Sequence, residues 1–154
     1  MKTFLAPFIT LALCAIIGSL PLYGQAADQQ LKPEAFQKRT DEGVELKLIL
    51  TNVSPKPVKL VTDHLQTIFP GRGGQLSVIL QQPVQVRDLG KDDIGSLLPG
   101  ESREIRLLVK KDQLPKEDTL IANVTYRISS EFGHQFGVWH GAISVSPSLE
   151  KRIQ

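Results

Sequence analysis

The sequence feature that most constrains this chain is an alternation of apolar and polar side chains along short segments. The clearest case spans residues 43–51, where every second residue from Val44 onward is Val or Leu. Because successive side chains of a strand point to opposite faces of a sheet, this spacing predicts a β-strand with one buried face. The pattern breaks at residues 52–57, which combine Asn52 and Ser54 with two prolines and therefore predict a turn.

The same alternation recurs through the rest of the chain and predicts an all-β fold. About seven short strands, separated by turn residues and without a convincing helical period, are typical of a β-sandwich. The connections are too short for helical crossovers, so we expect antiparallel pairing throughout. The expected strands span residues 44–51, 58–60, 76–81, 84–86, 104–110, 120–128 and 135–146.

The segments between these strands are interpreted as connections. Residues 27–42 are expected to be a linker or a first edge element, because a proline there suits either the first turn of a helix or an edge strand. Residues 61–70 and 88–96 have no clear period and are expected to be irregular. Three glycines make residues 71–74 a loop, and residues 129–134 are expected to be the tip of a hairpin.

Residues 1–26 have the composition of a secretory signal peptide. Lys2 precedes an almost wholly apolar run from Phe4 to Leu20, and Gly24 and Ala26 are small residues at the positions that a signal peptidase reads. The segment therefore predicts an exported protein, either periplasmic or secreted.

Two other fates of this segment are left open. The apolar run is close to the roughly 17 residues that span a bilayer, so it would also serve as an uncleaved anchor. Lipidation of Cys14 is the other, although Leu13 stands where lipoprotein signals have a small residue. Cleavage after the signal leaves a sandwich domain at residues 43–147 and a polar tail, expected to be frayed, at residues 148–154.

Cysteine content and charge exclude several classes of protein. Cys14 is the only cysteine, so the processed chain would have no disulfide, thiolate nucleophile or cysteine-based metal site. Of the 18 Lys and Arg residues only Lys2 lies in the signal, which leaves 17 basic against 16 acidic side chains and a net charge near +1. A nucleic-acid binder would cluster basic side chains among stacking aromatics, so we expect no nucleic-acid partner.

Two turn segments carry a family resemblance. Residues 52–58, Asn-Val-Ser-Pro-Lys-Pro-Val, and residues 98–102, Leu-Pro-Gly-Glu-Ser before an alternating strand, resemble bacterial exported immunoglobulin-like domains. Residues 114–118, Leu-Pro-Lys-Glu-Asp, are also similar to the first domain of pilus-assembly chaperones, whose second domain and basic cleft have no counterpart here. The resemblance implies an antiparallel immunoglobulin-like sandwich, and no functional residue is carried over from it.

The sequence contains no motif of a catalytic site. Neither a Gly-x-Ser-x-Gly elbow nor a His-Glu-x-x-His pair occurs. The glycine-rich loop at residues 71–74 is not followed by a helix start whose amides would hold a phosphate. We therefore predict a protein that is not an enzyme and that carries no cofactor.

Three histidines are the candidates for a metal site: His64, His134 and His140. In one continuous strand His134 and His140 would lie roughly 20 Å apart, at about 3.3 Å per residue. A shared site needs a bend between them, so we assign no metal site. The alternative function is nevertheless a small periplasmic metal- or ligand-binding protein that uses these histidines.

The candidate partner-binding residues lie in the predicted loops. A hairpin tip at residues 129–134 would expose Phe132, with His134 and Phe136 beside it, and aromatic anchors carry much of the energy of protein interfaces. Arg72 in the glycine-rich loop is the fourth candidate. The other interpretation is that a phenylalanine folds back over the end of the core.

The leading functional prediction follows from these residues and from the sandwich itself. We expect an exported, non-enzymatic module that binds an unknown protein or cell-envelope component through its loops or through an open sheet edge. A membrane contact is expected only if the N-terminal segment stays uncleaved or is lipidated.

Overall fold

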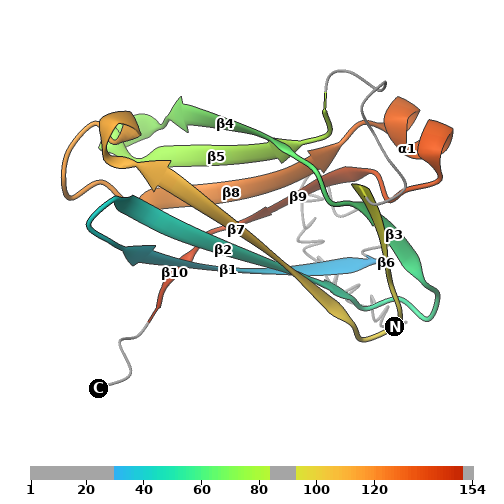
Figure 1. Cartoon of the computed structure of the whole chain (residues 1–154). Helices are drawn as coiled ribbons and strands as arrows, with labels where there is room; N and C mark the ends of the chain where they lie inside the picture. The colour runs from blue at the N-terminus through green and yellow to red at the C-terminus, as the bar shows by residue number, and fades with distance from the viewer. Residues whose placement is uncertain (1–29, 84–92, 151–154) are drawn as a thin grey trace, which may run out of the picture.

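The computed structural model describes residues 30–83 and 93–150. The expected signal at residues 1–26 and the expected strand at residues 84–86 lie outside the described residues. Within the described ranges the chain is mostly β-strand (Figure 1), as the sequence predicts. The strands are β1 (Leu31–Arg39), β2 (Gly43–Asn52), β3 (Val58–Val61), β4 (Leu65–Pro70), β5 (Leu76–Gln81), β6 (Ile94–Leu97), β7 (Ser102–Lys110), β8 (Ile121–Ile128), β9 (Gly141–Val145) and β10 (Ser148–Leu149). The helical elements are α1 (Ser130–Phe136) and the 3-10 turns η1 (Arg72–Gly74) and η4 (Lys111–Gln113).

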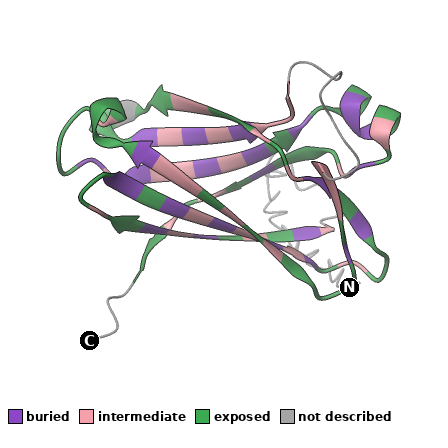
Figure 2. Cartoon of the chain, viewed as in Figure 1, coloured by how far each residue is buried: buried purple, intermediate pink, exposed green. Residues whose placement is uncertain are grey.

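Two four-stranded sheets form the main layers of the molecule. One has the strand order β10-β1-β2-β7 and the other β4-β5-β8-β9, while β3 and β6 form a separate two-stranded sheet. The two larger sheets lie one over the other in Figure 1. Buried residues alternate with more exposed ones along β2 and β5 (Figure 2), so each of these strands turns one face toward the interior.

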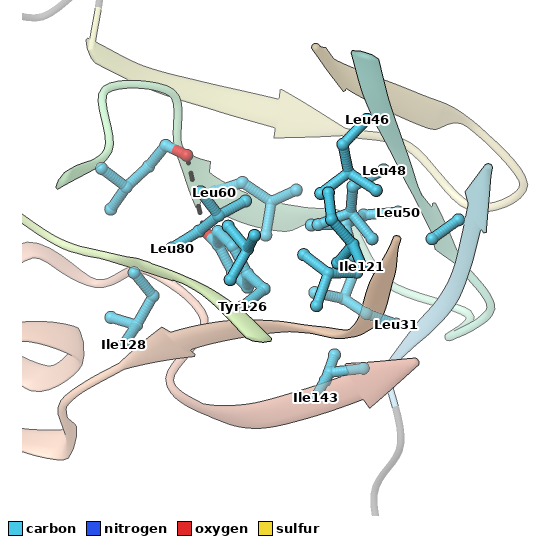
Figure 3. Close-up of a cluster of buried hydrophobic side chains, with 14 of the residues drawn as sticks. Leu31, Leu46, Leu48, Leu50, Leu60, Leu80, Ile121, Tyr126, Ile128 and Ile143 are labelled. Carbon is cyan, nitrogen blue, oxygen red and sulfur yellow. Dashed lines mark hydrogen bonds between the residues drawn. The ribbon is translucent and has the colours of Figure 1, made fainter. Parts of the chain in front are cut away.

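The core lies between the two larger sheets. Leu46, Leu48 and Leu50 of β2 point toward Ile121 of β8 in the opposite sheet (Figure 3), and all four side chains are almost completely buried. Full burial of one such side chain contributes about 1.5–3 kcal/mol relative to leaving it exposed. The half-buried strand predicted from the alternation after Gly43 is therefore confirmed.

Two strand pairs are parallel, so the expectation of antiparallel pairing throughout is wrong. β5 pairs with β8 in parallel, and β10 pairs in parallel with β1. Parallel neighbours require a long crossover between them. Between β5 and β8 the chain passes through β6 and β7, which belong to the other two sheets, and it then re-enters the sheet in its original direction.

β8 contains an irregularity that changes which side chains face the core. Its register against β5 shifts between the pairs formed by Leu76 and Ser77, so that one residue of β8 is skipped. As a result Ile121 is buried, whereas Ala122, which the alternation places on the inner face, is only partly buried. The predicted inward row of β8 is correct from Val124 onward and wrong before the irregularity.

Several strands lie where the sequence predicts connections. The segment left open as a linker or first edge element forms β1, and Pro33 is tolerated there because β10 pairs only with Phe36 and Gln37. β4 and β6 occupy segments expected to be irregular. The start of the expected frayed tail forms β10, while residues 151–154 lie outside the described residues. The sheet with the order β10-β1-β2-β7 thus includes two strands, β1 and β10, that lie outside the expected domain limits of residues 43–147.

The predicted hairpin tip is a short helix, α1, and this corrects the expectation for residues 129–134. The Ser129 side chain accepts a hydrogen bond from the backbone N–H of Phe132 (3.3 Å), and Gly137 ends the helix in the left-handed conformation (φ 63°). Serine before a helix and glycine after it are favourable caps. The last large strand therefore begins only at Gly141, not near residue 135.

The predicted turn after β2 is confirmed, and a buried asparagine organises it. Asn52 is fully buried, and its Nδ2 donates to the carbonyl oxygens of Lys56 (2.8 Å) and Leu97 (2.9 Å). Its Oδ1 accepts hydrogen bonds from the backbone N–H (2.9 Å) and the hydroxyl (2.8 Å) of Ser54. The side chain thus closes the turn and connects it to the end of β6.

Candidate interaction surfaces

Phe132 does not occupy an exposed tip. Its side chain is only 5% exposed and belongs to the hydrophobic core, and its ring lies 4.6 Å from the ring of Phe136, centre to centre. The two residues are one helical turn apart, which places them on the same face of α1. Phe136 is half-buried. The expectation that Phe132 is exposed is therefore wrong, and the alternative, in which a phenylalanine folds back over the core, describes the structure.

His134 and His140 lie side by side, although a continuous strand would have separated them. Their ring centres are 4.7 Å apart, the ring planes are inclined by 59°, and both residues are exposed. The bend comes from α1 and from Gly137, after which the N–H of Val138 donates to the carbonyl of Gly133 (3.0 Å). The chain thereby reverses and carries His140 back beside the helix.

Gly133 allows this close approach. An added Cβ at position 133 would lie 2.4 Å from the Cβ of His140 and 2.6 Å from its Cγ. Such contacts are far inside van der Waals range, so any larger residue would displace the imidazole. The glycine that suggested a hairpin tip instead provides space for a histidine.

A shallow groove of about 380 Å³ adjoins this pair and is bordered by Pro57, Lys59, Trp139 and His140. The backbone N–H of Trp139 donates to the carbonyl of Lys59 (2.8 Å), which holds the loop after α1 against β3. The indole also packs against the ring of Tyr126 at 5.6 Å. Trp139 is half-buried and partly belongs to the core, so the groove has a fixed wall.

The surroundings of His64 differ from those of the exposed pair His134 and His140. The ring centres of His64 and Tyr126 are 5.3 Å apart in an edge-to-face arrangement, and the Nε2 of His64 is buried with no hydrogen-bond partner among the described residues. Burial lowers the pKa of His64, and Arg103 lowers it further, while Asp63 and the backbone of Val61 and Thr62 oppose the shift. Within residues 30–83 and 93–150, no three His, Cys, Asp or Glu side chains form a group that could hold a metal ion.

Arg72 lies at the far end of its sheet from α1. It begins η1, just after β4, where Pro70 pairs with Leu76. At the other end of β5, the side chain of Gln82 donates to the hydroxyl of Ser129 (3.0 Å), the N-cap of α1. Six residues of strand separate these two ends by about 20 Å. The four predicted partner-binding residues therefore do not converge on one surface.

The sequence interpretation missed an exposed apolar surface on β4. Leu65 and Phe69 are 40% and 45% exposed, and their spacing of four residues places both on one face of the strand. Ile68, on the other face, packs against the core. The segment from Leu65 to Pro70 does not alternate apolar with polar residues, because each face carries both kinds, so no period of two indicated the strand.

β4 is also an edge strand. It pairs only with β5 within the described residues. The N–H of Gly71 donates to the carbonyl of Gln75 (2.7 Å), and bonded pairs recur at every second residue of an antiparallel ladder. Counting back from Gly71 in steps of two, the backbone N–H and C=O groups of Phe69, Thr67 and Leu65 point toward β5. Those of Gln66 and Ile68 therefore point away from it, toward the open edge.

The other long edges differ from β4 in charge and in cover. β7 carries two arginines, a glutamate and a lysine over its nine residues, and charged side chains of this kind protect a sheet edge from pairing. β9, at the opposite edge of its sheet, lies next to β1 of the other layer. β4 has no charged residue between Leu65 and Pro70, so it is the edge with the least protection among these three.

Two further findings bear on function. In the parts of the chain that are described, no helix combines the length and the apolar character needed to cross a membrane. Comparison of the chain with protein-family models, with curated proteins and with solved structures finds no match.

Proposed function

We propose that this chain is an exported, non-enzymatic β-sandwich module of immunoglobulin-like architecture that binds a protein or cell-envelope partner through β4. The observation that carries the proposal is the coincidence of an uncharged sheet edge with two exposed apolar side chains, Leu65 and Phe69. Export is supported by the composition of residues 1–26, and the architecture by the two facing four-stranded sheets.

Strand addition is the physical route for such binding. An extended partner segment alongside β4 would exchange backbone hydrogen bonds with Gln66 and Ile68, whose polar groups point away from β5. Leu65 and Phe69 would contact alternate side chains of that segment on the outer face of the sheet. Burial of their exposed apolar area would contribute about 25 cal/mol per Å².

Site-specific photocrosslinking tests the proposal. A benzophenone amino acid replaces Phe69 in one version of the chain and Leu98, which is 53% exposed in a loop, in the matched control. We expect irradiation in the native envelope to give a discrete crosslinked product from position 69 and none from position 98. Equal products from both positions, or no product from position 69, would contradict partner binding at β4.

A backbone change separates strand addition from contact by side chains alone. Gln66→Pro removes an N–H that points away from β5, and proline is tolerated on the open side of an edge strand. We expect this variant to fold normally and to lose the crosslink at position 69. A crosslink of unchanged yield would show that β4 binds its partner without accepting a strand.

A further inference from the structure

We propose that His134 and His140 together bind a divalent late transition-metal ion, with Cu²⁺ held most tightly. This site is independent of the β4 edge and uses side chains that strand addition leaves untouched. It rests on three observations: the ring centres are 4.7 Å apart, both residues are exposed, and Gly133 leaves room for the His140 ring against the helix.

The separation of the rings agrees with shared coordination of one ion. A metal–nitrogen bond of about 2.0 Å places the ion roughly 3 Å from the centre of each imidazole, so rings at adjacent coordination positions have centres about 4.5–5 Å apart. The observed 4.7 Å lies within that interval. The ring planes are inclined by 59°, so the rings are not stacked face to face, and both residues are exposed.

The backbone holds the two histidines at this separation before an ion arrives. His134 is in the last turn of α1, and His140 follows a left-handed glycine and a loop fixed by the Trp139–Lys59 backbone bond. The absent side chain at Gly133 leaves the space that the His140 ring occupies. A site assembled by folding loses less entropy on binding than two histidines on a flexible loop.

The donor set selects the class of ion. Imidazole nitrogen suits copper, zinc and nickel, whereas calcium and magnesium require oxygen ligands. For one set of nitrogen ligands, affinity rises from nickel to copper and falls again at zinc, which places Cu²⁺ first. No third His, Cys, Asp or Glu joins the pair within the described residues, so water or a ligand from a second molecule completes the coordination. Such a site is open and exchangeable, unlike the closed four-ligand sites that stabilise folds.

The test is a Cu²⁺ titration of the full chain, purified without a histidine tag and carrying Cys14→Ser so that no thiol competes. Resonances of the imidazole rings are followed by NMR, because bound Cu²⁺ broadens nearby nuclei. We expect the signals of His134 and His140 to broaden at substoichiometric Cu²⁺, while those of His64 persist. Broadening that leaves His134 and His140 unaffected would overturn the proposal.

Calorimetry with Zn²⁺ and single variants provides the second measurement. His134→Ala and His140→Ala should each weaken binding by at least about tenfold, since even an outer-shell partner of a metal ligand contributes 10–100-fold. Gly133→Ala keeps both imidazoles but displaces one, and should weaken binding as well. The exposed neighbour Gln135→Ala is the matched control and should bind like the parent chain. Unchanged affinity in both histidine variants would overturn the proposal.

Discussion

The side-chain amide of Gln37 is hydrogen-bonded to both backbone polar groups of Ile121. Its Nε2 donates to the Ile121 carbonyl and its Oε1 accepts from the Ile121 N–H, each at 2.9 Å. Gln37 lies on β1 and Ile121 on β8, so the contact joins the two larger sheets, and the glutamine is only 4% exposed. The pairing of β8 with β9 begins only at Val124, so beside Ile121 a side chain of the other sheet takes the place of a strand partner.

Replacement of this amide should therefore be costly. Gln37→Leu leaves the buried N–H and carbonyl of Ile121 without partners, and each unsatisfied group costs about 1–3 kcal/mol, so we expect a loss of about 2–4 kcal/mol in the free energy of unfolding. Urea denaturation measures it. Gln135→Leu, an exposed glutamine on α1, is the control and should change stability by less than about 0.5 kcal/mol. A Gln37→Leu variant as stable as the parent would show that water replaces the amide.

Asn52 provides a second prediction, because its buried amide makes four hydrogen bonds within and beside the turn. Asn52→Ala removes all four and takes the amide donor from the buried carbonyl of Leu97, while the Lys56 carbonyl keeps the Ser54 hydroxyl, so we expect a loss of about 2–4 kcal/mol. Ser54→Ala removes only the partner on the exposed side of the turn and should cost about 1 kcal/mol. Thermal unfolding of both variants gives the comparison. Similar losses for the two would mean that Ser54, not Asn52, organises the turn.

Local alternation made β2 and β5 predictable, because in a half-buried strand the sequence period directly reflects the two faces of the sheet. β4 was missed because its sequence, Leu-Gln-Thr-Ile-Phe-Pro, has no such period: apolar and polar residues occur on both of its faces. The role of Gln37 depends on a contact with a residue 84 positions away, which no local period encodes. Parallel pairing of β5 with β8 likewise depends on the path of the whole chain.

The candidate site was less predictable than the fold. Proximity of His134 and His140 depends on a single short helix, and α1 spans seven residues, too few to establish a helical period. Ser129 before it and Gly137 after it were the available signals, since they are favourable caps. Together with Gly133 they were instead interpreted as turn residues, and the same error placed Phe132 at an exposed tip.

Burial of Phe132 changes what its removal should do. Phe132→Ala empties a space in the core beneath α1, and truncation of a buried phenylalanine typically costs about 3–5 kcal/mol. Phe69→Ala, the matched change at a half-exposed ring on β4, should cost less than about 1 kcal/mol. Guanidinium denaturation of the two variants measures the difference. If Phe132→Ala left stability intact, the ring would not belong to the core.

His64 should make stability depend on pH. Its pKa is lowered in the folded state, chiefly by burial and to a smaller extent by Arg103, against the opposing effects of Asp63 and the nearby backbone. The unfolded chain, with an ordinary pKa near 6.5, therefore binds a proton more readily than the folded chain as the pH falls. This contribution to stability is present above pH 6.5 and is lost progressively below it, at no more than about 1.4 kcal/mol per pH unit for one proton.

Urea midpoints between pH 7.5 and pH 5 measure that dependence. Carboxylates also titrate at the lower end of this range, so the informative quantity is the difference between the parent chain and His64→Phe, which retains an aromatic ring against Tyr126 but cannot be protonated. We expect the variant to lose stability more slowly than the parent on acidification. Gln135→Leu, which changes an exposed side chain that carries no titratable group, should follow the parent curve. Identical slopes for the parent and His64→Phe would mean that the buried Nε2 accepts its proton at no cost to the fold.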